Sequence, residues 1–109
     1  MTDRAGALRD WLAKKPGDRF ATYALALEVK KAGDLAEAER LLEALVLAHP
    51  HAGAGWYQLG VLHEEQGATE AAANAWRRGL AALRDADGPE ERRSRGEIER
   101  ALDSLDDGS

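Results

Sequence analysis

The strongest constraint on how this chain folds is a repeat of 34 residues. Identical residues coincide when the sequence is shifted by that distance, among them Leu25 and Leu59, Gly33 and Gly67, Ala38 and Ala72, and Pro16 and Pro50. Repeats of this length are single supersecondary units, each with an apolar face that only a neighbouring unit can bury. The period therefore predicts a stack of such units, and it directs attention to the surface of the stack rather than to a catalytic cleft.

Composition agrees with a small helical protein. The 109 residues suffice for one domain, and the bias toward Ala, Leu, Glu and Arg favours helix. A net charge of −5 argues against nucleic acid as a partner. The chain has no cysteine, which excludes disulfides and favours the cytoplasm. Residues 44–63 carry no charged side chain, but Pro50 interrupts them, so no membrane span is expected.

Apolar residues recur at helical spacing in two consecutive hairpins. Residues 19–52 form the first predicted unit, in which one amphipathic helix ends at Gly33 and the next begins at Asp34. Glu37 follows Asp34 at the spacing of a capping box. Residues 53–86 repeat this plan, with the turn at Gly67.

The flanking segments are predicted to cap the two units. Residues 1–16 match the second half of a repeat, since Leu8 and Trp11 lie 34 residues before Leu42 and Leu45. Residues 88–105 are predicted to form a closing helix, and residues 106–109 an acidic tail. The apolar positions of the closing helix form one narrow stripe: Ile98, Leu102 and Leu105. A helix with one apolar side suits the end of a stack.

The second unit resembles the tetratricopeptide repeat, whose pattern is Trp-x-x-Leu-Gly, then Ala-x-x-x-Phe, then Pro. The matching positions here, which we expect to pack the repeats, are Trp56, Leu59, Gly60, Ala72 and Trp76, with Leu25, Ala26, Ala38, Leu42 and Pro50 in the first unit. Thr22 stands where the first unit would have the tryptophan. The resemblance covers residues 19–86. It implies an all-α fold, a right-handed α-solenoid of antiparallel helical hairpins, with about six helices in a single domain over residues 1–109.

The resemblance also implies where a partner binds. In this family the first helix of each repeat lines a concave groove for a peptide or protein segment, which makes the protein a non-catalytic scaffold. The corresponding side chains are Phe20, Tyr23, Leu27, Lys30 and Lys31 in the first repeat and Tyr57, Val61 and Glu64 in the second. Tyrosine is a common anchor in binding surfaces. The alternative interpretation is that the two tyrosines complete the core.

No residue pattern points to a reaction. The sequence lacks the glycine-rich phosphate loop and the common nucleophile motifs, so we expect no enzyme activity and no cofactor. The three histidines have no obvious carboxylate partner, so we expect no metal site. A second functional hypothesis is self-association, because two repeats are fewer than the three that usually make a stable stack. Exposure of Trp11 or of the stripe at Ile98 would favour a homodimer.

Overall fold

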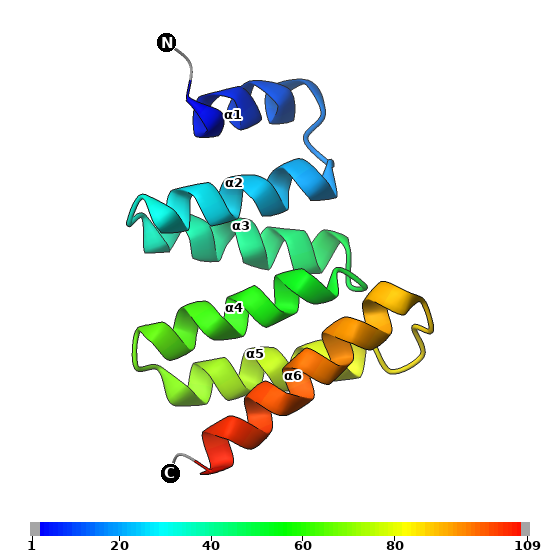
Figure 1. Ribbon diagram of the computed structural model, residues 1–109. Helices are drawn as coiled ribbons and strands as arrows, with labels where there is room; N and C mark the ends of the chain where they lie inside the picture. Colours follow the sequence, from blue (N-terminus) through cyan, green and yellow to red (C-terminus); the bar gives the residue numbers. More distant parts are fainter. Residues whose placement is uncertain (1–2, 108–109) are drawn as a thin grey trace. The chain divides into compact units, whose positions relative to one another are not determined.

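The computed structural model describes residues 3–107, and within that range the chain is entirely α-helix and connecting loop (Figure 1). The helices are α1 (Arg4–Lys14), α2 (Arg19–Lys31), α3 (Leu35–Ala48), α4 (Gly53–Glu65), α5 (Thr69–Ala82) and α6 (Pro89–Asp107). The predicted all-α fold is confirmed. The outer ends of two predicted segments, residues 1–2 and 108–109, lie outside the described residues.

The chain divides into two compact units, residues 1–49 with α1, α2 and α3, and residues 50–109 with α4, α5 and α6. In the first unit α2 packs against both α1 and α3 (Figure 1). The α2–α3 hairpin turns at Gly33, whose φ of 93° is unfavourable for other residues. The backbone N–H of Asp34 then donates to Val29 O at 2.9 Å, which closes α2.

The start of α3 differs from the expected capping box in one respect. Asp34 Oδ1 accepts from the backbone N–H of Glu37 at 3.1 Å, as predicted. The backbone N–H of Asp34 is already bonded to Val29 O, however, and the Glu37 carboxylate binds Arg9 on α1. The second bond of a capping box, from the Asp34 N–H to the Glu37 carboxylate, does not form. The N–H is bonded to Val29 O instead, and the carboxylate is bonded to Arg9.

Small residues let the helices of the first hairpin approach each other. Ala26 on α2 and Ala38 on α3 are completely buried. Ala21 is also buried, and the larger apolar side chains of this core are Leu25, Val29, Leu42, Leu45 and Val46. The core thus alternates small and large residues, as the repeat pattern predicts.

The second hairpin, α4–α5, uses glycine in the same role. A Cβ on Gly60 would overlap the indole ring of Trp76, which is buried against α4. Trp76 Nε1 donates to the backbone carbonyl of Tyr57 at 3.1 Å. Gly67, with a φ of 77°, forms the turn. The bulky indole at Trp76 therefore fits only because α4 has no side chain at residue 60.

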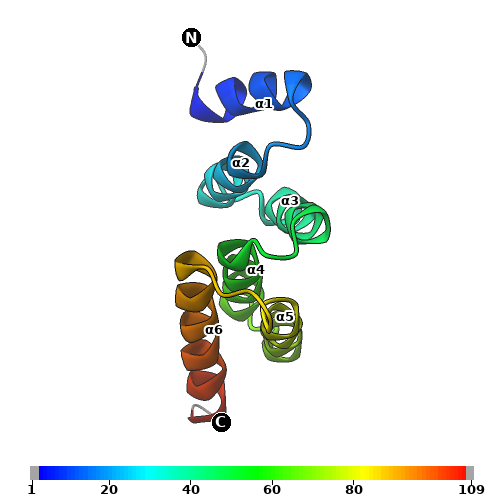
Figure 2. The same cartoon turned by 90° about the vertical axis from the view of Figure 1, so that its right-hand side faces the viewer.

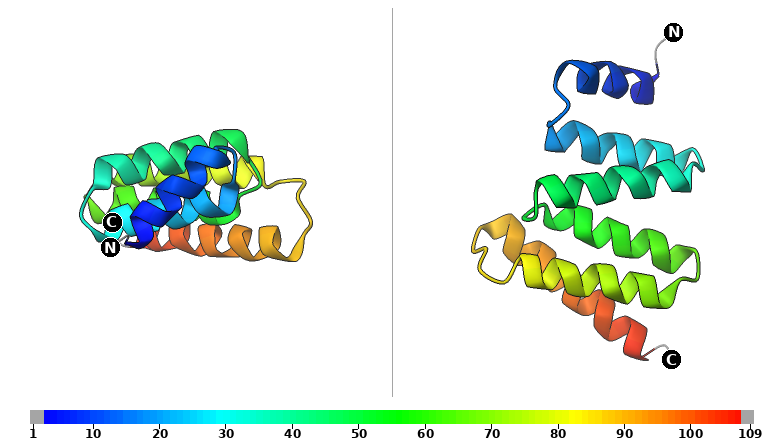
Figure 3. Two further views of the ribbon diagram at one scale, coloured as in Figure 1. Left: turned by 90° about the horizontal axis from the view of Figure 1, so that it is seen from above. Right: turned by 180° about the vertical axis from the view of Figure 1, so that it is seen from behind.

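Helix α6 lies against both α4 and α5 (Figure 2). Ile98 is fully buried there, and a Cβ on Gly79 would lie 2.7 Å from Trp56 Cβ and 3.3 Å from Ile98 Cδ1. A long connection leads from α5 to α6 (Figure 3). Arg95 fixes it by donating to the carbonyls of Leu83 at 2.6 Å and Ala86 at 2.9 Å.

The last helix is longer than expected. It continues through Asp107 rather than ending at residue 105, because no proline or glycine interrupts the sequence there. The first two residues of the predicted acidic tail are therefore helical.

Candidate functional site

The predicted binding side chains of the first repeat follow one side of α2, at steps of three and four residues. Tyr23, Leu27 and Lys30 are half-buried, and Lys31 is exposed. Phe20, at the start of the helix, is 77% exposed, an unusual value for an aromatic side chain. The outward side of α2 thus combines aromatic and aliphatic area with cationic side chains near its end.

The predicted side chains of the second repeat lie on α4. Tyr57 stacks on Trp76 with ring centroids 6.5 Å apart and an interplanar angle of 23°. Tyr57 and Val61 are half-buried, and Glu64 is exposed. Tyr57 therefore packs beside the buried Trp76 while the residue as a whole stays partly accessible.

A third feature of the surface, which the sequence did not predict, is a hollow between α1 and α2. We call it the α1–α2 hollow, and its lining residues are Leu8, Trp11, Asp18, Phe20, Ala21 and Ala24. Its volume is about 360 Å³. Trp11 is 46% exposed. The repeat register contained one signal for it, because Leu8 and Trp11 correspond to buried Leu42 and Leu45 but belong to only half a repeat.

Asp18 organises one end of the hollow. Its Oδ2 accepts from Trp11 Nε1 at 2.8 Å, and its Oδ1 accepts from the backbone N–H groups of Phe20 and Ala21, which caps α2. The bond from Trp11, followed by the bond from Ala21, lowers the pKa of Asp18 below its ordinary value. Lys15 adds a smaller effect in the same direction. Asp18 is therefore an ionised cap at neutral pH.

Two cations flank the aromatic rings of the hollow. Lys15 Nζ lies 5.4 Å from the centroid of the Trp11 ring, and Arg19 Cζ lies 5.7 Å from that of Phe20. Both distances are within the range of cation–π attraction. The apolar lining thus has a cationic rim.

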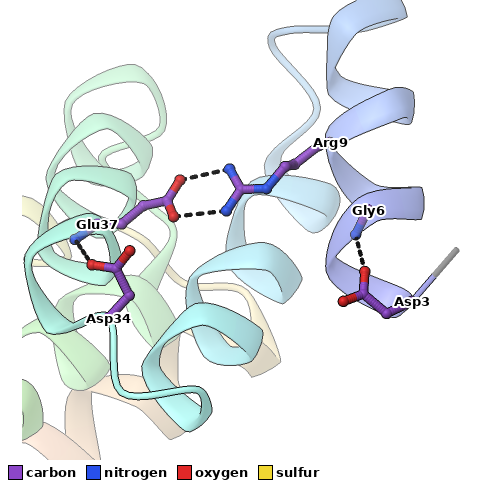
Figure 4. Close-up of polar contacts among 5 residues, drawn as sticks. All are labelled: Asp3, Gly6, Arg9, Asp34 and Glu37. Carbon is purple, nitrogen blue, oxygen red and sulfur yellow. Dashed lines mark hydrogen bonds and ion pairs between the residues drawn. The ribbon is translucent and has the colours of Figure 1, made fainter.

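An ion pair joins α1 to α3 within the same unit (Figure 4). The Arg9 guanidinium donates to both carboxylate oxygens of Glu37, at 2.6 and 2.7 Å. This hydrogen bond raises the pKa of Arg9 and lowers the pKa of Glu37. The pair fixes α1 in place through two parallel bonds, a geometry that a lysine could not supply.

Of the ten residues predicted to pack the repeats, nine are buried, and the tenth, Pro50, is exposed. Pro50 lies in the turn before α4, where its carbonyl accepts from Trp56 Nε1 at 2.9 Å. Within residues 3–107, no three His, Cys, Asp or Glu side chains gather in a way that could bind a metal ion. None of the described helices is both long and apolar enough to cross a membrane.

Comparison with known proteins identifies the fold. No protein-family model and no curated protein matches this sequence. The crystal structure of a tetratricopeptide repeat domain protein from Salinibacter ruber is similar, with a TM-score of 0.69 and 28% sequence identity, over 82% of this chain and 96% of that one. The chain therefore has a tetratricopeptide-repeat-like fold, as the residue pattern predicts. This fold indicates a protein-interaction scaffold in general.

Proposed function

We propose that this protein is a non-catalytic scaffold that binds protein or peptide segments through the outward side of α2 in its first unit and the outward side of α4 in its second. The observation that carries the proposal is the half-buried state of Tyr23 and Tyr57. Each tyrosine is packed enough to lose little conformational freedom on binding, yet the residue stays partly accessible. Tyr57 is the stronger case, since Trp76 fixes its ring.

Charge adds to the selectivity of these surfaces. Lys31 is exposed near the end of α2, whereas Glu64 is exposed near the end of α4. An acidic residue in a bound segment would complement Lys31 on α2, and a basic one would complement Glu64 on α4. We also expect a bound segment to have at least one bulky apolar side chain.

The titration properties of Asp18 and Glu37 fit structural roles for these two residues. The pKa values of Asp18 and Glu37 are lowered, and in each case the largest cause is a hydrogen bond from a structural partner, Trp11 or Arg9. Catalytic acids and bases have pKa values shifted toward neutrality. These two carboxyls are shifted away from it, as expected of a helix cap and an ion pair.

Self-association is the second candidate function. The exposure of Trp11 and Phe20 favours it, because a second copy could cover these rings. Light scattering across about a hundredfold range of concentration separates the two candidates. A mass that stays at one chain removes self-association, whereas a doubling of mass supports it.

The scaffold proposal is tested by photo-crosslinking followed by a binding measurement. A photoreactive amino acid is placed at Tyr23 or Tyr57, and at exposed Arg84 as the matched position. A partner that crosslinks at residues 23 and 57 but not at 84, identified by mass spectrometry, is then purified. We expect Tyr23→Ala with Tyr57→Ala to weaken its binding about tenfold or more. Unchanged affinity would overturn the assignment of these surfaces.

A further inference from the structure

We propose that the α1–α2 hollow is a second docking site, which receives an amphipathic helix from a partner protein, with carboxylates flanking its apolar stripe. This site uses α1 and the start of α2 rather than Tyr23 and Tyr57. Phe20, which was predicted for the groove, also lines the hollow, so the two sites adjoin on α2 and are tested with different partners.

The hollow concentrates the exposed large apolar side chains of the protein. Among the described residues, three such side chains are exposed: Trp11, Phe20 and Leu47. Trp11 and Phe20 line the hollow, whereas Leu47 lies on α3. Singly exposed apolar residues are ordinary, but two aromatic rings that line one shallow, open hollow are typical of an interaction site.

The repeat register indicates that a helix fits there. Leu42 and Leu45 on α3 are 0% and 3% exposed, and α2 packs along α3. Leu8 and Trp11 occupy the same two repeat positions on α1. No helix among residues 3–107 takes the place beside α1 that α2 takes beside α3. A helix from a partner would bury these positions in the way that α2 buries their counterparts.

The wall of the hollow is fixed before any partner arrives. Trp11 is bonded to Asp18, which in turn caps α2. The connection between α1 and α2 is also held from α3, where His49 Nε2 lies 3.1 Å from the carbonyl of Gly17. A surface already fixed in this way loses little conformational entropy on binding.

Charge selects the chemistry of the occupant. Residues 1–49 carry eight basic and eight acidic side chains, while residues 50–109 carry seven basic and twelve acidic ones. In this neutral unit, Lys15 and Arg19 lie over the two exposed rings. The carboxylate that lines the hollow, Asp18, already accepts three hydrogen bonds. A partner with carboxylates beside its apolar stripe complements the rim.

A second copy of this chain fits less well. Two hollows packed face to face would bring Lys15 and Arg19 of one copy toward the same cations of the other, which is unfavourable. Helix α6 is acidic and amphipathic, but the first residue of its apolar stripe, Ile98, is fully buried in its own unit, and Leu102 and Leu105 are half-buried. The hollow is therefore better matched to a different protein.

The test titrates the full chain with synthetic helices and follows tryptophan emission. Trp11 is the exposed tryptophan, while Trp56 and Trp76 are buried, so a change in emission reports on the hollow. The probe is a peptide of about 18 residues with leucine at helical spacing and glutamate beside it. A second peptide has lysine in place of every glutamate. We expect the acidic peptide to shift the emission to the blue and to bind about tenfold more tightly than the basic one.

Matched variants locate the site. Phe20→Ala should weaken the acidic peptide about tenfold, while Leu47→Ala, which removes an equally exposed apolar side chain from α3, should not. Lys15→Glu with Arg19→Glu should abolish the preference for the acidic peptide. The same charge change at exposed Arg77 and Arg84 should preserve it.

Three results would overturn the proposal. The first is no emission change with the acidic peptide up to about 1 mM. The second is equal loss of binding in Phe20→Ala and Leu47→Ala. The third is a dimer in solution whose formation shields Trp11 from acrylamide, since the occupant would then be a second copy. Circular dichroism of each variant shows that a loss of binding is not a loss of fold.

Discussion

Trp11 Nε1 donates a hydrogen bond to Asp18 Oδ2 at 2.8 Å, so the most exposed tryptophan of the protein is held by the residue that caps α2. One carboxylate therefore does two things. It fixes the position of the Trp11 ring at the edge of the α1–α2 hollow, and it satisfies backbone N–H groups at the start of α2. The stability of this unit and the shape of the hollow should thus depend on the same ionisation.

The first prediction concerns pH. The pKa of Asp18 is lowered in the folded protein, chiefly by the bond from Trp11. Its stabilising effect is therefore complete above the ordinary aspartate pKa of about 3.9, and is lost as the pH falls through that value toward the lower folded pKa. We expect Asp18→Asn to be less stable than wild type at pH 7 and to lose less stability on acidification.

Urea unfolding at pH 7 and at about pH 3 measures this difference. Glu37→Gln serves as a comparison. It should also lose less stability than wild type on acidification, because the Arg9 hydrogen bond lowers the pKa of Glu37. If wild type and Asp18→Asn lose the same amount of stability between the two pH values, the Trp11–Asp18 bond does not contribute to folding.

The second prediction concerns two glycines that respond oppositely to alanine. At Gly60 an added Cβ would overlap the rigid indole of Trp76, so Gly60→Ala should destabilise the protein by about 1–3 kcal/mol. At Gly96 the nearest atom is Arg100 Nη1 at 3.4 Å, the end of a flexible side chain. Gly96→Ala should stabilise α6 by about 0.5–1 kcal/mol. Denaturant midpoints measure both. A Gly60→Ala variant as stable as wild type would refute the account of how α4 and α5 pack, and a destabilised Gly96→Ala variant would refute the open environment of Gly96.

The third prediction tests the small residues of the hairpins. Ala38 and Ala72 are completely buried, so leucine at either position should overpack the hairpin and cost about 1–3 kcal/mol. Ala44 on α3 and Ala54 on α4 are exposed and provide controls, where leucine should change stability by less than about 0.5 kcal/mol. Thermal melts check this prediction. Equal losses of stability for the buried and the exposed substitutions would contradict the placement of Ala38 and Ala72 between tightly packed helices.

The helices and their ends could be predicted because their signals are local. Gly33 and Gly67 follow amphipathic segments, and both adopt the positive φ that a helix-ending turn requires. The hydrogen bond from the Glu37 N–H to Asp34 could likewise be predicted, because both residues lie within four consecutive positions. The absence of the second bond of the capping box could not be predicted, because Arg9, which binds the Glu37 carboxylate, is 28 residues away.

The candidate binding surfaces were less predictable, because they too depend on contacts between residues far apart in the sequence. The 34-residue repeat aligns Leu8 and Trp11 with Leu42 and Leu45, which are buried on α3. Whether Leu8 and Trp11 are buried as well depends on which helices lie beside α1. Periodicity also places Tyr23 and Tyr57 on equivalent sides of their helices, but it cannot show that Tyr57 rests on Trp76. Packing between elements decides both, and no single segment encodes it.

The central claim is that α2 and α4 bind a protein segment through Tyr23 and Tyr57. The most direct test is the affinity of a purified partner, identified by crosslinking at those positions, for wild type, for Tyr23→Ala with Tyr57→Ala, and for Leu47→Ala. The account predicts about a tenfold or greater loss in the double variant, with wild-type affinity in Leu47→Ala. Wild-type affinity in the double variant, with its fold intact, would contradict it.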